Sequence, residues 1–366
     1  MAISAARRQP ATPAAVYSRA HEQVTKRFPL LGTQPFMPLP APRGQWPYRL
    51  ELADVLPPAT TRAIEQAGHL RFHSVGDSGG VPDPAPQHAV AAAMAAELGG
   101  PDPARFFYHL GDVVYGYGEE AGYRAQFIDP YADYHAPIFA VPGNHDGDLE
   151  PGSGARSLEA FVGHFCAPTQ VRTASRREIC QPNVYWTLRH RWVTIVGLYS
   201  NVPDGGRIGE EQIEWLVGEL TDAPRDAVLI LALHHCLYST DEIHGSNLAL
   251  ADVLDGAFAR ARRAPDAVFS GHVHSYQRFS RMYGDRVIPH VVAGTGGVNN
   301  LQEIAPGVPD LPASFSRLLG VTLEAYQDTS WGYLTVTCGP GGAEVSYHTA
   351  ERGVATPLDS FSIGLA

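Results

Sequence analysis

The sequence predicts a layered α/β fold with more than one sheet, and two patterns lead to that prediction. Between residues 70 and 274, short apolar runs of strand length alternate with longer helix-like stretches, which is typical of strands connected by helices. After residue 286, strand-like runs follow one another without helices, which indicates antiparallel strands added to a second sheet. An apolar content of 44% in 366 residues is sufficient for a sizeable core.

The first part of the chain shows little periodicity. Residues 1–68 are proline-rich, and within them residues 48–52 look like a strand. We therefore expect an irregular N-terminal extension over residues 1–68 and a single domain over residues 69–366. Within that domain we expect an insertion loop at about residues 150–182, which contains several Gly, Ser and Arg residues.

Apolar runs bounded by turn residues predict the strands of the domain, and longer runs with helical periodicity predict its helices. The early strands are expected at residues 70–77, 105–112, 137–146, 191–200, 226–235 and 266–274. The helices are expected at residues 86–98, 119–134, 209–220 and 247–264. The late strands are expected at residues 287–294, 331–339 and 343–349.

Charge and hydropathy narrow the classes of partner. The formal net charge is −11, so a nucleic acid is not an expected partner, because nucleic-acid binding usually needs a basic surface. No apolar run approaches the roughly 18 residues of a membrane helix, so no membrane is expected either. Arg7 and Arg8 are not followed by the apolar stretch of an export signal, so we expect a cytoplasmic protein, or an exported one if the N-terminus is truncated. The oligomeric state has no signature in the sequence.

The four cysteines do not have the C-x-x-C spacing of a metal or redox motif. Cys166 and Cys180 flank one loop-like segment and would pair in an exported protein, whereas free thiols are expected in a cytoplasmic one.

Polar residues gather where the expected strands end. The segments HSVGD, YHLGD, VPGNHD, LALHH and SGHVH each continue an apolar run and carry Asp, Asn or His. Singly, each has an ordinary explanation, since an Asp at a strand end commonly caps the next helix and most histidines are not ligands. Five such ends in one chain predict a metal site, because the loops after the carboxyl ends of strands form the binding crevice of α/β sheets.

The segment GDSGG at residues 76–80 also suggests a serine nucleophile. Chymotrypsin-like proteases carry this sequence, but their His and Asp precede the serine, and only 75 residues precede Gly76. The G-x-S-x-G elbow of α/β-hydrolases suits a strand followed by a turn, but it leaves the other polar strand ends unexplained. We therefore favour Asp77 as a metal ligand over Ser78 as a nucleophile.

Together, GDSG at residues 76–79, GDVVY at 111–115, GNHD at 143–146, His234 and GHVH at 271–274 resemble the calcineurin-like metallophosphoesterase superfamily. Two details favour its purple acid phosphatase branch: Gly79 replaces the histidine of the general D-x-H motif, and Tyr115 lies three residues after Asp112. The resemblance covers about residues 70–350. It implies a four-layer α/β/β/α sandwich of two mixed β-sheets flanked by helices, with a metal site at the carboxyl ends of the strands.

The resemblance also implies two metal ions. One would be held by Asp77, Asp112, Tyr115 and His274. The other would be held by Asp112, Asn144, His234 and His272, so that Asp112 bridges the two. The ordinary pKa of tyrosine is about 10, so its ionisation at neutral pH needs a strong Lewis acid. This favours Fe(III) beside Tyr115, with Fe, Zn or Mn as the divalent partner.

The implied reaction is hydrolysis of a small phosphate ester by metal-bound hydroxide, with His145 as the proton donor. His244 is a candidate substrate contact, and a solvated loop histidine is the alternative. Asp146 would orient a neighbour or lie exposed after its strand, and His235 would lie behind the ligands or in the core. A phosphomonoesterase, a phosphodiesterase or nucleotidase with the same centre, and a non-catalytic metal-binding scaffold all stay open.

Overall fold

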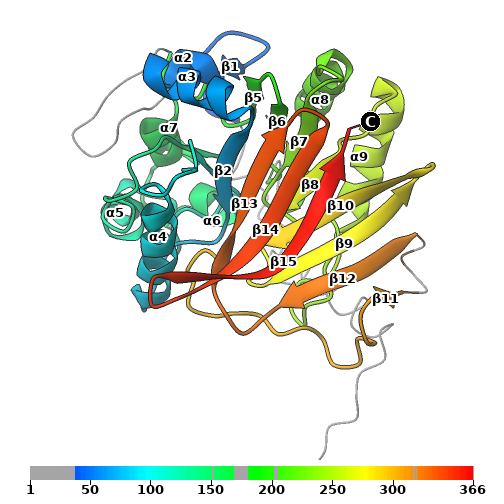
Figure 1. The fold of residues 1–366 in the computed structure, drawn as a ribbon. Helices are drawn as coiled ribbons and strands as arrows, with labels where there is room; N and C mark the ends of the chain where they lie inside the picture. Colours follow the sequence, from blue (N-terminus) through cyan, green and yellow to red (C-terminus); the bar gives the residue numbers. More distant parts are fainter. Residues whose placement is uncertain are drawn as a thin grey trace, which may run out of the picture.

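The structure is a computed structural model that describes residues 38–150, 152–168, 180–201, 205–315, 318 and 320–365. Its strands form two sheets (Figure 1). The larger sheet has nine strands in the order β1-β5-β6-β7-β8-β10-β9-β12-β11, and the smaller has six in the order β15-β14-β13-β2-β3-β4.

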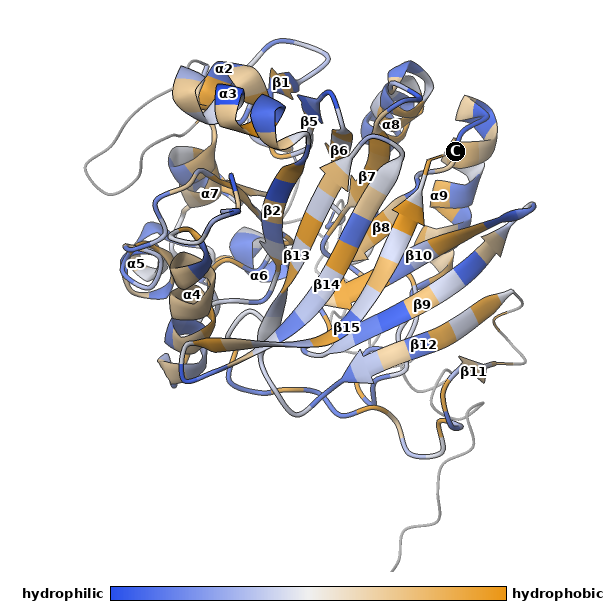
Figure 2. Cartoon of the chain, viewed as in Figure 1, coloured by the Kyte–Doolittle hydropathy of each residue, from blue (hydrophilic) through white to orange (hydrophobic). Residues whose placement is uncertain are grey.

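The nine-stranded sheet has a parallel centre and mixed margins, in which β1 pairs with β5 in parallel and the other pairs are antiparallel. The parallel run consists of β6 (Val193–Gly197), β7 (Val228–Ala232), β8 (Ala267–Ser270) and β10 (Arg286–Ala293). The margins are β1 (Arg49–Glu51), β5 (Trp186–His190), β9 (Tyr276–Tyr283), β12 (Val321–Gln327) and β11 (Ala313–Ser314). Every residue of β7 is apolar and buried (Figure 2), as expected for a strand covered on both faces.

The six-stranded sheet combines three parallel strands with an antiparallel meander. The parallel strands are β2 (Leu70–Val75), β3 (Phe107–His109) and β4 (Ile138–Ala140). The meander is β13 (Gly332–Gly339), β14 (Gly342–Glu351) and β15 (Val354–Gly364), and β13 pairs with β2. The late strands at residues 331–339 and 343–349 are therefore antiparallel additions, as predicted.

Helices cover the outer faces of the two sheets. Helix α4 (Ala85–Glu97) contacts β13, β14 and β15, whereas α8 (Glu210–Asp222) contacts β6 and also α9 (Leu248–Ala261). Two shorter elements, α5 (Glu120–Tyr123) and the π-helical turn η1 (Arg124–Ile128), connect β3 to β4, and α6 (Asn144–Gly147) follows β4. The α/β/β/α order predicted from the resemblance is thus confirmed.

Aromatic side chains join the inner faces of the sheets. The ring of Trp186 on β5 lies 5.9 Å from that of Tyr108 on β3 and 5.5 Å from that of Phe139 on β4. Tyr276 on β9 stacks on Tyr347 of β14, with 3.9 Å between the ring centroids. These contacts fix the strand ends of one sheet relative to those of the other.

The strand expected at residues 48–52 is present as β1, but the irregular structure expected up to residue 68 is not observed at residues 52–67. Strand β1 belongs to the nine-stranded sheet, and α2 (Leu52–Val55) and α3 (Pro58–Ala67) follow it. Pro58 at the first position and Gly68 with φ of 73° are ordinary start and stop residues for α3. Ile64 is the one side chain of this helix that is fully buried. Residues 1–37 lie outside the described residues.

The structure differs from two other expectations. The segment expected as an insertion loop at 150–182 contains α7 (Glu159–Phe165), whose Phe161, Val162 and Phe165 are buried. Residues 151 and 169–179 of that segment lie outside the described residues. The strand expected at 287–294 is β10, which pairs in parallel with β8 in the larger sheet rather than joining the second one.

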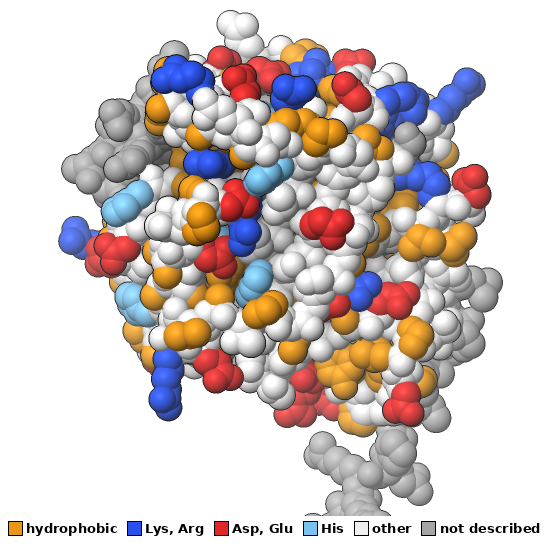
Figure 3. Space-filling view, viewed as in Figure 1, with side chains coloured by type: hydrophobic (Ala, Val, Ile, Leu, Met, Phe, Trp, Pro, Cys, Tyr) orange, Lys and Arg blue, Asp and Glu red, His pale blue; other side chains and the backbone are white. Residues whose placement is uncertain are grey.

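The described residues also bear on the expectations for a membrane helix, for surface charge and for the cysteines. No helix in the described ranges has the length and apolar character to cross a membrane. Acidic and basic side chains are interspersed on the face formed by α4 and β13–β15 (Figure 3). No disulfide joins Cys166 and Cys180, and both side chains are buried.

Candidate metal centre

The seven predicted ligands converge from the strand ends of both sheets. On the smaller sheet, Asp77, Asp112 and Asn144 follow β2, β3 and β4, and Tyr115 lies in the loop after β3. On the larger sheet, His234 follows β7, and His272 and His274 follow β8. All seven are buried or partly buried.

Three of these side chains form a first group. The Tyr115 Oη lies 3.0 Å from Oδ1 of Asp77 and 3.1 Å from Nε2 of His274. The same His274 nitrogen is 3.6 Å from Oδ1 of Asp77. A carboxylate, a phenol and an imidazole therefore meet at one point.

Three others form a second group around an amide oxygen. The Asn144 Oδ1 lies 3.1 Å from Nε2 of His234 and 3.0 Å from Nδ1 of His272. The backbone N–H of His272 donates to Oδ2 of Asp77 at 2.8 Å, which links this group to the first.

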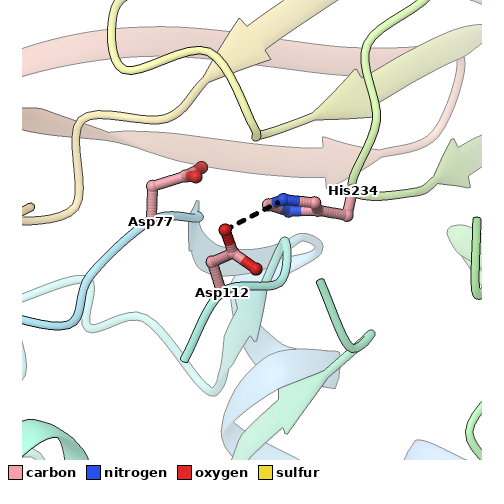
Figure 4. A group of neighbouring side chains, drawn as sticks. All are labelled: Asp77, Asp112 and His234. Atoms are coloured by element: carbon pink, nitrogen blue, oxygen red, sulfur yellow. Dashed lines mark ion pairs between the residues drawn. The ribbon is translucent and has the colours of Figure 1, made fainter. Parts of the chain in front are cut away.

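Asp112 adjoins both groups. Its Oδ2 lies 3.2 Å from Nε2 of His234 (Figure 4). Its Oδ1 accepts the backbone N–H of His145 at 2.9 Å. Asp77, Asp112 and His234 each offer a ligand atom, and these atoms all lie within 4.8 Å of one another. This position is the one that a bridging carboxylate would need.

The backbone at these strand ends is strained. Asp77, Asp112 and His272 have φ values of 59°, 52° and 71°, a region that non-glycine residues rarely adopt. Such conformations persist where the surrounding structure holds them, and they concentrate at functional sites. The strain supports a functional role for the three residues.

The hydrogen bonds of two histidines indicate that a cation fits here. Nδ1 of His234 lies 2.9 Å from the carbonyl oxygen of Leu110, and Nδ1 of His274 lies 3.0 Å from that of Asn300. Carbonyl oxygens only accept, so each Nδ1 carries a proton, and Nε2 of each ring faces a carboxylate oxygen. Lone pairs that face one another are stabilised by a proton or a metal ion, and carbonyl partners of this kind commonly orient metal-bound histidines.

The pKa values of the donors also indicate that a cation fits at this site. Burial, opposed by the charge of His234, raises the pKa of Asp77 to about 7. Burial would lower the pKa of His234, but Asp112 and Asp77 outweigh it and raise this pKa to about 9. Burial and then the charges of Asp77 and Asp112 raise the pKa of Tyr115 well above 10. A bound cation would favour the ionised carboxylates and phenolate that burial disfavours.

Tyr115 also explains why residue 79 is a glycine. A Cβ at Gly79 would lie 2.7 Å from Cδ2 of Tyr115 and 2.6 Å from Oε1 of Gln126. The tyrosine ring therefore fills the space that a side chain at residue 79 would need. A side chain at residue 79 and the ring of Tyr115 would overlap in this structure.

His145 stands beside the first group. Its ring packs against that of Tyr115 with 4.7 Å between centroids, and 35% of its side chain is exposed. Its Nδ1 lies 3.6 Å from Oδ2 of Asp148, a carboxylate that the motif analysis did not single out. This position leaves the imidazole accessible from solvent.

His244 and His235 flank the second group. The ring centroids of His244 and His235 lie 4.5 Å and 4.4 Å from that of His272. Nδ1 of His235 lies 2.9 Å from the hydroxyl oxygen of Ser200, and burial lowers the pKa of His235 well below its usual range. His235 is thus a neutral side chain behind the ligands, whereas His244 is partly exposed.

Asp146 is buried rather than exposed. Its carboxylate accepts the backbone N–H groups of Val113, Val114 and Gly143 at distances of 2.8 to 3.2 Å. It therefore ties the loop after β3, which carries Asp112, to the turn after β4, which carries Asn144. The reading of Asp146 as a surface carboxylate is wrong.

Ser78 is fully buried, and its Oγ lies 2.8 Å from Nε2 of His109. Nδ1 of His109 accepts the backbone N–H of Gly111 at 3.2 Å, so the proton of the neutral ring is on Nε2. His109 donates to Ser78 and cannot remove the serine proton in this state. The geometry therefore agrees with the expectation that Ser78 is not a nucleophile.

Comparison with known proteins decides the family. A sequence model described as calcineurin-like phosphoesterase matches residues 70–276, a range that includes every predicted ligand. This chain belongs to the calcineurin-like phosphoesterase family.

Sequence relatives support the purple acid phosphatase branch of this family. Purple acid phosphatase 22 of Arabidopsis thaliana is 34% identical over 218 residues, which are 57% of this chain and 45% of that protein. Tartrate-resistant acid phosphatase type 5 of Oryctolagus cuniculus is 28% identical over 259 residues, 62% of this chain and 73% of that protein. The chain spans less than half the length of the plant relatives that it matches.

Solved structures confirm the phosphoesterase fold. A purple acid phosphatase from yellow lupin seeds has a TM-score of 0.57 at 19% identity, covering 81% of this chain and 54% of that one. GAP50, described as the anchor in the inner membrane complex of Plasmodium, has a TM-score of 0.60 at 15% identity, covering 81% and 89%.

Several residues that support the phosphoesterase site were not anticipated from the sequence. Gln126 binds the backbone N–H and carbonyl of Tyr115, and Gln302 accepts the backbone N–H of His274 at 3.0 Å. Asp148 and Asp241 contact His145 and His244. A short polar motif does not reveal such partners, although an Asp three residues from a candidate histidine, as in both Asp–His pairs, is a usable signal.

Proposed function

We propose that this family member is a purple acid phosphatase-like enzyme that hydrolyses small phosphomonoesters with two metal ions. The observation that carries the proposal is the arrangement of six donors in two groups, with Asp112 adjoining both. The family model and the phosphatase relatives support the same reading. A phosphodiesterase or nucleotidase would use the same centre.

The donors suit two different ions. Asp77, Tyr115 and His274 with Asp112 would hold Fe(III), because a buried phenol needs a strong Lewis acid to ionise. Asn144, His234 and His272 with Asp112 would hold a divalent ion, Fe, Zn or Mn. When bound, two such ions would neutralise phosphate charge and lower the pKa of a coordinated water.

The protein's own side chains supply orientation and a proton. The hydrogen bond from the His145 backbone to Asp112 fixes this histidine relative to the carboxylate that adjoins both groups. Its exposed ring can then meet the ester oxygen of the leaving group and donate a proton as the bond breaks. His244, on the side of the second group, would contact the phosphate.

The test combines metal analysis with turnover. We expect roughly one iron and one further metal per chain, a visible tyrosinate-to-iron band, and faster hydrolysis of p-nitrophenyl phosphate than of its diester. His145→Ala should retain both metals and lose most of the monoesterase activity. If the protein contained two divalent ions and had no visible colour, the assignment of Fe(III) would be wrong. Faster hydrolysis of the diester would favour a phosphodiesterase. Failure to bind metal after reconstitution would overturn the enzyme and favour a binding scaffold.

A further inference from the structure

The turn at residues 239–246 is folded around one buried carboxylate. Asp241 has no solvent exposure. Its Oδ1 accepts from the Ser239 hydroxyl at 2.7 Å and from the Gly245 backbone N–H at 2.9 Å. Its Oδ2 accepts the backbone N–H groups of Ile243 and His244 at 2.9 and 2.8 Å.

The same carboxylate reaches the His244 ring. Nδ1 of His244 lies 3.3 Å from Oδ2 of Asp241. A carboxylate oxygen that already accepts two backbone N–H groups can only accept here, so Nδ1 carries a proton. The other ring nitrogen, Nε2, remains for a ligand. The ring rests 4.5 Å from that of His272, at the margin of the second donor group.

The turn is itself fastened to the segments that carry the centre. Oε1 of Gln277, three residues after His274, accepts the Thr240 backbone N–H at 2.9 Å and its hydroxyl at 3.0 Å. The carbonyl of Thr240 accepts the N–H of Ala305 at 2.8 Å. Nearby, Gln302 holds the backbone of His274. The His244 turn therefore has a defined place relative to the candidate ligands.

We propose that Asp241 is a positioning residue for substrate binding: it holds the His244 ring through the proton on Nδ1 and directs Nε2 to the substrate phosphate, to which the imidazolium form of the ring donates a hydrogen bond from Nε2. The proposal deepens the proposed function and rests on it. It makes Asp241 act through His244, in contrast to a carboxylate that only builds a turn. If Asp241 only built the turn, its loss would lower the stability of the protein without a specific effect on phosphate binding.

The first experiment separates binding from turnover in the metal-loaded enzyme. Asp241→Asn keeps the volume of the side chain and removes its charge. We expect the KM for p-nitrophenyl phosphate and the inhibition constant of inorganic phosphate to rise about tenfold, with a smaller change in kcat. His244→Ala should give a similar rise, and the double variant should bind no more weakly than His244→Ala alone.

A matched control accounts for the loss of any buried carboxylate. Asp266 is also buried, accepts the Leu229 backbone N–H at 2.8 Å and pairs with Arg286, but it precedes β8, at the end of that strand opposite His272. Asp266→Asn should lower thermal stability and leave KM unchanged. The proposal is overturned if Asp241→Asn leaves KM and phosphate inhibition unchanged, or if its effect persists in full in the His244→Ala background.

A second measurement needs no change at Asp241. In the zinc-loaded protein, long-range proton–nitrogen correlation spectra report which imidazole nitrogens carry protons, and His244→Gln identifies the signals of His244. A proton on Nδ1 supports the proposal, and an unprotonated Nδ1 overturns it. Absence of phosphatase activity in the unmodified enzyme would instead count against the proposed function, and this measurement would still report on the Asp241–His244 contact.

Discussion

Asp148→Asn tests the role of His145 more sharply than removal of His145 itself. The Asp148 carboxylate lies 3.6 Å from Nδ1 of His145, and both residues follow β4 within one short turn. A carboxylate at this distance attracts an imidazolium ring, the form of histidine that donates a proton to a leaving group. The amide would keep the size of the side chain and remove that charge. We expect slower hydrolysis of esters with poor leaving groups and little change for esters with good ones.

The magnitude follows from the distance and the exposure. At 3.6 Å, two unit charges interact by about 1 kcal/mol in water and by about 5 kcal/mol at the effective dielectric of a protein surface. The side chains are 35% and 28% exposed, so solvent screening reduces the value toward the lower end, about 1.5 kcal/mol. This corresponds to about tenfold in the rate for alkyl phosphates.

The assay is kcat/KM for a series of aryl and alkyl phosphates at pH 7. The variant should show a steeper decline with leaving-group pKa, and the difference should vanish in a His145→Ala background. Burial, opposed by His145, raises the pKa of Asp148 to about 6, so the wild-type advantage should shrink as the pH falls below 6. Asp129→Asn is the control. Asp129 also pairs with a cationic side chain, that of Arg124, at 3.6 Å, but this pair lies outside the candidate metal centre. An equal loss for every ester would refute proton donation through this pair.

Other outcomes follow from the same structure. Tyr115→Phe should abolish the visible band while iron remains bound by the other donors, and persistence of the band would assign the colour to another residue. Gly79→Ala should displace Tyr115, since its Cβ would lie 2.7 Å from that ring, and should shift the visible maximum. The pKa of Glu97 would be raised by burial, but His73, Tyr333 and Arg71 lower it from 4.5 to about 2. Its stabilisation is therefore present above pH 4.5 and is lost as the pH falls toward 2, about 2–3 kcal/mol in all. Glu97→Gln should lower the free energy of urea unfolding at pH 7 and flatten its change over that acid range, and an unchanged profile would contradict the assignment.

The strands that carry the ligands could be predicted because they are buried on both faces. Strand β7 is a continuous apolar run, β2, β3 and β8 are largely buried with several apolar residues each, and all four are followed by a polar motif. Strand β9 was missed because Arg278, Ser280 and Met282 alternate with buried residues in a strand that is covered on one face. Strand β15 contains Pro357 and several exposed polar residues, which weaken any strand signal.

The donors could be predicted in the same way, but their supports could not. Asp77, Asp112, Asn144 and the histidines lie in short motifs after the strands, and each motif has a pattern that can be recognised in the sequence. Gln126, Asn300 and Gln302 act through positions that the fold sets, at separations that no local pattern records. The glycine at residue 79 is explained only together with Tyr115. A side chain at residue 79 would occupy the space that the Tyr115 ring fills.

The centre joins the two sheets, and this explains why it cannot be reduced to local motifs. In the first group, Asp77 and Tyr115 come from the smaller sheet and His274 from the larger one. In the second group, Asn144 comes from the smaller sheet and two histidines from the larger. An ion held by either group would therefore link the sheets, and its binding free energy would contribute to their association. The packing of Trp186 against Tyr108 and Phe139 aligns the strand ends without an ion, so the donor positions depend on the inter-sheet core as much as on the motifs themselves.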